Sequence, residues 1–141
     1  MLESSYQSKI IKSIEALGGV VVNGSFSKTG EADLQCGWPI KQRELTDAEE
    51  YDLIVRYGTV VLDDIGPKLI HLAVEVKTEK DYHRVMKCIN ADYTLNGKTG
   101  LKEHEPMQMA KIRRNRKLGG LALVAYSFKQ VKEYVDANYK D

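Results

Sequence analysis

The chain has 141 residues, of which 43% are hydrophobic and 29% charged, so it has the size and composition of a single globular domain spanning residues 1–141. No apolar stretch approaches the roughly 20 residues that cross a bilayer, and the N-terminus lacks a signal-peptide pattern. We therefore expect a cytoplasmic protein with no membrane partner. Cys36 and Cys88 lack zinc-ligand spacing and are predicted to be buried free thiols.

The charges nearly balance, with 21 Lys and Arg against 20 Asp and Glu and a net charge of +1. This balance argues against a protein that holds nucleic acid by bulk positive charge alone. The charges are nevertheless segregated, because acidic residues gather in Glu44–Asp52 and basic residues in Lys111–Lys117. Such segregation fits either a polarised binding surface or two ordinary solvent-facing helices.

The first third of the chain predicts a helix and two strands. Apolar residues recur every three or four positions from Leu2 to Leu17, which predicts a helix that ends at Gly18-Gly19. The β-branched residues 20–22 predict a short strand. Alternating apolar and polar residues in Glu31–Cys36 predict a half-buried strand.

The next segment predicts an acidic helix followed by a hairpin. Thr46 and Glu49 have the spacing of a capping box, which predicts a helix near residues 47–57. Residues 59–62 and 68–77 have strand-like composition, and turn-forming residues separate them. We expect these two strands to pair antiparallel.

The remainder of the chain alternates helices with one strand. Helices are predicted around residues 82–89 and 106–118, and the apolar run 121–126 predicts a buried strand. Ser127 and Gln130 form a second capping-box spacing before a final helix. The order of elements predicts an α/β fold with a mixed central β-sheet flanked by helices.

The predicted strand at 69–77 has two unlike faces. One face is uniformly apolar and consists of Ile70, Leu72, Val74 and Val76. The other face consists of His71, Ala73, Glu75 and Lys77. Glu75 and Lys77 lie about 7 Å apart on that face. Burying such a pair costs free energy, so a functional role is one reason for its presence there. A plain ion pair at a sheet edge is the alternative, and His71 fits a hydrogen-bonded core residue.

Asp33 lies on the polar face of its own strand. If the two strands are neighbours, Asp33 and Glu75 converge and provide the oxygen ligands that Mg²⁺ prefers. Lys77 could then orient a water molecule or stabilise an oxyanion.

Several segments together resemble a known family. They are Gly30-Glu31-Ala32-Asp33-Leu34, Val74-Glu75-Val76-Lys77-Thr78, Gln108 at the start of a helix, Gly119-Gly120, and Leu123-Val124-Ala125-Tyr126-Ser127. This set resembles the PD-(D/E)XK nuclease superfamily, and most of all its VRR-NUC branch of small, often phage-encoded nucleases related to Holliday-junction resolvases. The resemblance implies a restriction-endonuclease-like core and leaves residues 37–68 and 79–103 unmatched.

The resemblance also implies a set of site residues. By it, Asp33 and Glu75 bind Mg²⁺, for which Mn²⁺ can substitute, and the Val76 carbonyl completes the protein ligands. Lys77 is then the catalytic lysine, and Gln108 matches a glutamine that this branch places beside the site.

Related resolvases add a glutamate from the first helix, and Glu3 is the residue here that can fill that place, with Gln7 one turn further on. The proline of the family motif is replaced by Ala32. Because the separation between Asp33 and Glu75 is long, the acids at 63–64 are rival ligands.

We therefore predict a Mg²⁺-dependent DNA endonuclease that selects branched DNA or four-way junctions and acts as a homodimer, since a two-fold symmetric substrate calls for two active sites. Two alternatives stay open. One is a non-catalytic module that binds nucleic acid or a protein partner on the same fold, and the other is a phosphoesterase acting on RNA or nucleotides. Candidate phosphate contacts are Lys9, Lys12, Lys28, Lys41, Arg43, Arg113, Arg114 and Arg116.

Overall fold

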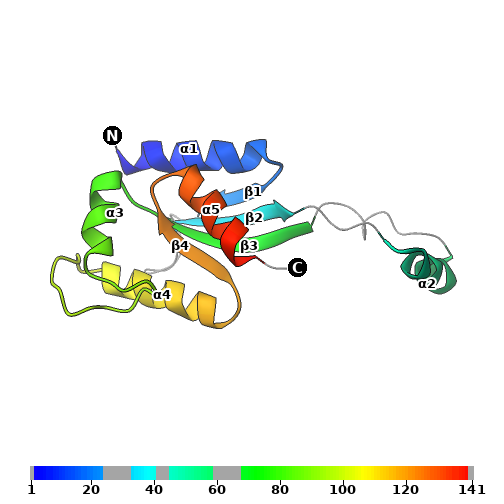
Figure 1. The fold of residues 1–141 in the computed structure, drawn as a ribbon. Coiled ribbons are helices and arrows are strands. Elements are labelled where there is room, and N and C mark those ends of the chain that lie inside the picture. Colours follow the sequence, from blue (N-terminus) through cyan, green and yellow to red (C-terminus); the bar gives the residue numbers. More distant parts are fainter. Residues whose placement is uncertain (1, 24–32, 41–44, 59–67, 140–141) are drawn as a thin grey trace.

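The computed structural model describes residues 2–23, 33–40, 45–58 and 68–139. The elements follow one another as α1 (Glu3–Ala16), β1 (Val20–Asn23), β2 (Leu34–Ile40), α2 (Asp47–Tyr57), β3 (Lys68–Val76), α3 (Glu79–Met86), α4 (Glu105–Lys117), β4 (Leu121–Ala125) and α5 (Phe128–Asn138). The strands form one sheet in the order β1-β2-β3-β4, in which β1–β2 and β2–β3 are antiparallel and β3–β4 is parallel. This mixed sheet, flanked by helices, confirms the predicted α/β class (Figure 1).

Two pairs of helices cover the two faces of the sheet. On one face, buried residues of α1 and α5 form a core with Leu72, Val74 and Val76 of β3. On the other face, α3 and α4 form a second core with Ala73 of β3 and Ala122 of β4. The last five residues of β3 are buried because helices cover both of its sides. The alternation in the sequence predicts these two faces correctly.

Local capping signals set several helix boundaries. The helix α1 ends before Gly18, whose φ of +93° favours glycine. Thr46 and Glu49 form the predicted capping box of α2, and Ser127 and Gln130 form that of α5. These side chains satisfy backbone groups that the first turn of a helix leaves unpaired.

The strand β2 runs further toward its C-terminal end than the sequence predicts. The prediction covers residues 31–36, whereas the strand spans Leu34–Ile40, and residues 31–32 lie outside the described part of the chain. Trp38 continues the buried face of β2 and stacks on Phe128 with ring centroids 5.8 Å apart. Pro39 lies two residues beyond Gly37, the last residue of β2 that pairs with β1, and an edge position of this kind tolerates proline.

The sequence also predicts the partner strand of β3 and the burial of His71. The strand predicted at 59–62, the hairpin partner, lies outside the described residues; β3 pairs with β2 and β4. The prediction that His71 is a core residue is wrong, because its side chain is exposed and Nε2 lies 2.7 Å from Oε1 of Gln35. The core on this face reaches Ala73 but does not extend to His71.

Both cysteines are buried and unbridged, which confirms the prediction of free thiols. Burial raises the pKa of the Cys36 thiol to about 12, so this thiol is protonated at neutral pH. Sγ of Cys88 lies 3.5 Å from the carbonyl oxygen of Arg84. Such thiols pack as small apolar side chains.

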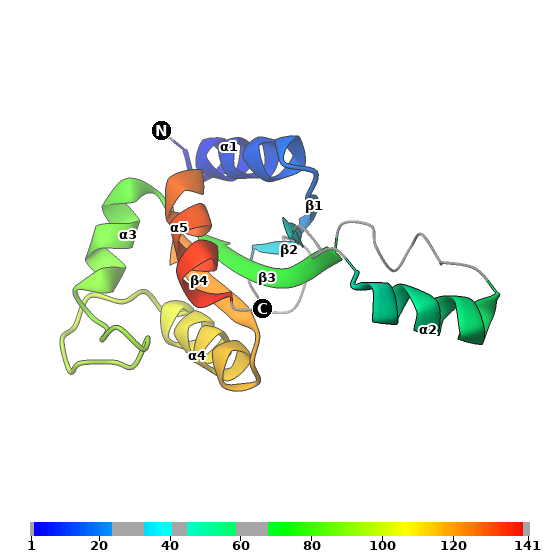
Figure 2. The same cartoon turned by 45° about the vertical axis from the view of Figure 1, so that its right-hand side comes forward.

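The acidic cluster, except Glu44, which lies outside the described residues, is carried by α2, away from the rest of the fold. None of the α2 side chains is buried, and Figures 1 and 2 both show the helix standing apart from the sheet. The basic cluster lies on α4, which packs on the sheet. Within the part of the chain that the structure describes, no helix has both the length and the apolar character needed to cross a membrane.

Burial in the sheet predicts the effect of core truncation. Leu72→Ala removes a side chain that is 0% exposed, so the free energy of unfolding should fall by about 2–5 kcal/mol. The same substitution at Leu118, which is 82% exposed, should change it by less than about 0.5 kcal/mol. Urea unfolding of both variants measures the difference, and equal effects would contradict this description of the core.

Candidate functional site

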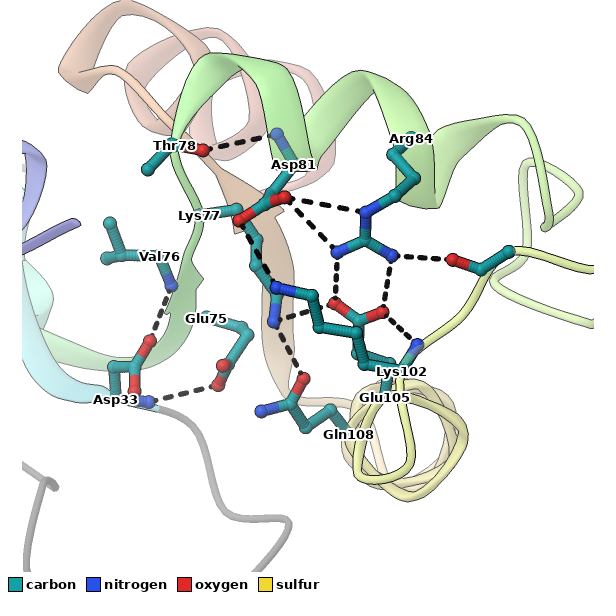
Figure 3. Close-up of polar contacts among 11 residues, drawn as sticks. Asp33, Glu75, Val76, Lys77, Thr78, Asp81, Arg84, Lys102, Glu105 and Gln108 are labelled. Carbon is teal, nitrogen blue, oxygen red and sulfur yellow. Dashed lines mark hydrogen bonds and ion pairs between the residues drawn. The ribbon is translucent and has the colours of Figure 1, made fainter. Parts of the chain in front are cut away.

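The β2–β3 pairing brings two acidic residues together. Asp33 directly precedes β2, whose first residue, Leu34, pairs with Val74 of β3. The backbone amide of Asp33 donates a hydrogen bond to Oε2 of Glu75 at 3.2 Å, and Oδ2 of Asp33 accepts one from the amide of Val76 at 2.9 Å. Figure 3 shows the two acidic side chains side by side near the end of β3.

Burial raises the pKa of both carboxyl groups. Glu75 is 2% exposed, and its pKa rises to about 9, first because of burial and then because of the charge of Asp33, while Lys77 acts in the opposite direction. Burial also raises the pKa of Asp33, against the hydrogen bond from Val76. Without a cation between them, the two carboxyls therefore hold a proton at neutral pH.

A divalent cation is the partner that this pair fits by its chemistry. Two carboxylates are the usual protein contribution to a Mg²⁺ site, where water and substrate oxygens complete the octahedron. A cation would also relieve the repulsion from Asp33 that raises the pKa of Glu75. Among residues 2–23, 33–40, 45–58 and 68–139, no group of three or more His, Cys, Asp or Glu side chains forms a metal cluster. The Val76 carbonyl as a third protein ligand stays a prediction, and the rival acids at 63–64 lie outside the described residues.

Lys77 follows β3 and is nearly buried, with a side chain that is 10% exposed. Its Nζ donates to Oε1 of Gln108 at 3.1 Å and lies 3.1 Å from Oε2 of Glu105 (Figure 3). Both partners lie in the first part of α4. The alternative of a simple Glu75–Lys77 ion pair is therefore not what the structure shows, since the carboxylate that pairs with Lys77 is Glu105.

Glu105 is a site residue that the sequence analysis misses. It is 2% exposed and accepts two hydrogen bonds from the guanidinium of Arg84. In the sequence, an acid just before Pro106 looks like an ordinary first-turn residue of a helix, which the helix dipole favours anyway. The spacing of Glu105 from Gln108, which places both on one helical face, is the signal that could have found it.

Glu3 lies within electrostatic range of Asp33 and Lys77. The pKa of Glu3 is raised, first by burial and then by the charge of Asp33, while the charge of Lys77 opposes this. The N-terminal end of α1, which carries Glu3, lies beside α3 in Figure 1. A role for Glu3 in the site stays a prediction.

An open cavity of about 420 Å³ lies between α4 and the sheet. Its polar lining consists of Gln35, Lys111, Arg114 and Asn115. Lys111 and Asn115 thus line the same cavity, whereas Gln108 contacts Lys77. Gly120 lies so close to Asn115 that an added Cβ would meet its Oδ1 at 1.9 Å.

The basic residues of α4 divide into two groups. Arg113 donates to the carbonyl oxygen of Tyr93, and Arg116 donates to that of Ala122 at 2.6 Å and stacks on Tyr93. These two arginines, predicted as phosphate contacts, are therefore engaged with the protein itself. Arg114 is exposed and lines the cavity. The candidates Lys28, Lys41 and Arg43 lie outside the described residues.

Comparison with known proteins gives one similar structure. No protein-family model matches the chain, and neither does any curated protein. A solved structure described as a VRR_NUC domain is similar with a probability of 1.00 and a TM-score of 0.49. The two sequences are 22% identical, and the match covers 97% of each chain. Its description names the same family that the sequence motifs resemble.

The raised pKa of Glu75 predicts how stability depends on pH without a metal. Between the ordinary glutamate value of 4.5 and about 9, the folded protein binds a proton that the unfolded chain has released. In EDTA, the free energy of unfolding should therefore fall as the pH rises through this window. Glu75→Gln should remove this part of the slope.

Urea unfolding at several pH values in EDTA measures the effect. The matched control is Glu133→Gln, because Glu133 lies on α5 and its side chain is 67% exposed. This control should keep the slope of the unmodified protein. Equal slopes for Glu75→Gln and the unmodified protein would contradict the prediction.

Proposed function

We propose that the chain is a divalent-metal-dependent DNA endonuclease that hydrolyses phosphodiester bonds. The observation that carries the proposal is the convergence of Asp33 and Glu75 at the end of β3, on the strand that leads into the nearly buried Lys77. A carboxylate pair suits a hard cation, and an ammonium beside it suits the negative charge of a reacting phosphate.

The residues divide the chemistry among them. Asp33 and Glu75 would hold Mg²⁺, or Mn²⁺ in its place, and the Val76 carbonyl would be a further ligand. Such an ion, when bound, lowers the pKa of a water molecule and neutralises charge on the phosphoryl group. Lys77 orients the attacking water or stabilises the charge on the phosphate oxygens, and Gln108 holds the Lys77 ammonium.

Removal of the carboxylate pair tests the catalytic proposal. Glu75→Gln and Asp33→Asn should each lower the cleavage rate by at least about 10³-fold, which corresponds to about 4 kcal/mol of transition-state stabilisation. Cleavage should also require Mg²⁺ or Mn²⁺ and stop in EDTA. Glu133→Gln is the matched control and should cleave at the unmodified rate.

The same assay separates the proposal from its alternatives. Labelled four-way junctions, linear duplex DNA, RNA and nucleotides are incubated with the protein and Mg²⁺. A non-catalytic binding module would cleave none of them, with or without Glu75. Turnover of RNA or nucleotides without turnover of DNA would replace the endonuclease by a different phosphoesterase.

We propose that the cavity lined by Lys111 and Arg114 receives the DNA backbone. Neutralising a phosphate contact weakens binding to all sequences alike and reduces its dependence on salt. Lys111→Ala and Arg114→Ala should each weaken DNA binding several-fold and lower the salt slope by about one unit. The matched control is Lys129→Ala, because Lys129 lies on α5 and pairs with Glu133. This variant should bind DNA as the unmodified protein does. Fluorescence anisotropy at several salt concentrations measures both quantities.

The preference for branched DNA and the homodimer form a second part of the proposal. A four-way junction has two equivalent strands to cut, so two active sites related by a two-fold axis match its symmetry. Sedimentation equilibrium determines the number of subunits. Competition between a junction and a linear duplex of equal length determines the preference.

A further inference from the structure

A second ionic centre adjoins the carboxylate pair. Glu105 is as buried as Glu75, at 2% exposed, yet it is bound to two cationic side chains, Arg84 and Lys77, and to one backbone amide. Arg84 of α3 donates to Oε1 at 2.7 Å and to Oε2 at 2.9 Å, which is the bidentate geometry of a strong pair. The backbone amide of Lys102 donates to Oε1 at 2.6 Å.

These contacts fix the position of the Glu105 carboxylate independently of Lys77. Burial alone would raise its pKa, but the hydrogen bonds from Arg84, Lys102 and Lys77 outweigh burial and hold the pKa at about 2. Arg84 is itself anchored, because it also donates to the carbonyl of Gly100 at 2.7 Å and pairs with Asp81. Glu105 is therefore a charged and immobile acceptor.

The ammonium of Lys77 is held at two points by one turn of α4. A lysine side chain is flexible, so a single hydrogen bond leaves its ammonium several positions. Glu105 and Gln108 are three residues apart and lie on the same face of the helix, and each places an oxygen 3.1 Å from Nζ. Two acceptors on a rigid element define the ammonium position more narrowly than Gln108 alone.

Charge balance explains why Lys77 needs a counter-ion of its own. A divalent cation on Asp33 and Glu75 would neutralise those two carboxylates. The ammonium of Lys77, with its side chain only 10% exposed, would then lack a compensating charge if Glu105 were neutral. Asp81 pairs with both Arg84 and Lys102, so Arg84 has a second carboxylate partner besides Glu105.

We infer that Glu105 is a positioning residue. Arg84 holds its carboxylate, and this carboxylate in turn holds the ammonium of Lys77 toward the reacting phosphate. This inference rests on the proposed nuclease function and adds two residues, Glu105 and Arg84, to the site. Glu105 acts through Lys77 and does not touch the substrate itself.

Kinetics of Glu105→Gln tests the inference under single-turnover and steady-state conditions. This substitution keeps the shape of the side chain and removes its charge, so kcat should fall roughly 10- to 100-fold with KM unchanged. Glu103→Gln is the matched control, since Glu103 lies two residues earlier with an exposed side chain. Arg84→Lys loses the bidentate hydrogen bond to Glu105 but keeps the positive charge. Its kcat should fall less than that of Glu105→Gln.

A double-mutant comparison shows whether Glu105 acts through Lys77. In a Lys77→Ala background, Glu105→Gln should cause no further loss of the remaining activity, because the group that it positions is gone. Additive losses would overturn the inference. So would a Glu105→Gln variant that cleaves as fast as the unmodified protein, or faster, since faster cleavage would mean that Glu105 restrains Lys77.

NMR of the lysine ammonium groups supplies a readout that does not depend on cleavage. With ¹⁵N-labelled lysine, Lys77 should give a resolved, rigid ammonium signal in the unmodified protein and in Glu103→Gln, and should lose it in Glu105→Gln. A mobile Lys77 in the unmodified protein would overturn the inference while leaving the endonuclease proposal intact. A rigid signal together with an unmodified protein that cleaves no DNA would instead reject the endonuclease proposal.

Discussion

The antiparallel pairing of β2 with β3 is the constraint on which the site depends. Asp33 and Glu75 are 42 residues apart in the chain, and the register that sets Leu34 opposite Val74 makes them neighbours. A shift of one residue would turn either side chain to the other face of the sheet. The register is held because Leu34, Cys36 and Trp38 must all face the same core.

Two ionic arrangements with opposite character meet at the end of β3. In one, Asp33 and Glu75 lie together in a buried place, and burial is the main reason why the pKa of each is raised. In the other, Glu105 lies between Arg84 and Lys77, and its pKa is lowered. Glu75 and Glu105 are equally buried, so the difference comes from their partners and not from their exposure. Of the two arrangements, only the Asp33–Glu75 pair has negative charge that a divalent cation could neutralise, because Glu105 is already paired with Arg84 and Lys77.

The helices contribute to the site as rigid supports. The start of α3 directly after Lys77 places Arg84 opposite Glu105, and the start of α4 presents Glu105 and Gln108 together. Ion pairs between α3 and α4 thus tie the two helices of one face at the position where β3 ends. The other face of the sheet, covered by α1 and α5, supplies the larger apolar core and keeps β3 in place.

Much of this arrangement can be predicted from the sequence, because it depends on local periodicity. The capping residues Thr46 and Ser127, the two faces of β3 and the presence of an acid and a lysine at the end of that strand are all visible in the spacing of side chains. The same reasoning fails for His71, since alternation reveals which face a residue takes but not whether a helix covers that part of the sheet. It also ends β2 too early, because Gly37 and Pro39 hide a strand that Trp38 continues.

The sequence by itself therefore determines the elements, the acidic and basic side chains and the face that each occupies, because these follow from interactions between residues a few positions apart. Only the tertiary structure decides which charges meet. Lys77 pairs with Glu105 and not with its sequence neighbour Glu75, and Arg113 and Arg116 bind carbonyl oxygens of the protein itself. The physical reason is that ion pairs and hydrogen bonds act over a few ångströms in space, and packing of the helices on the sheet sets those distances.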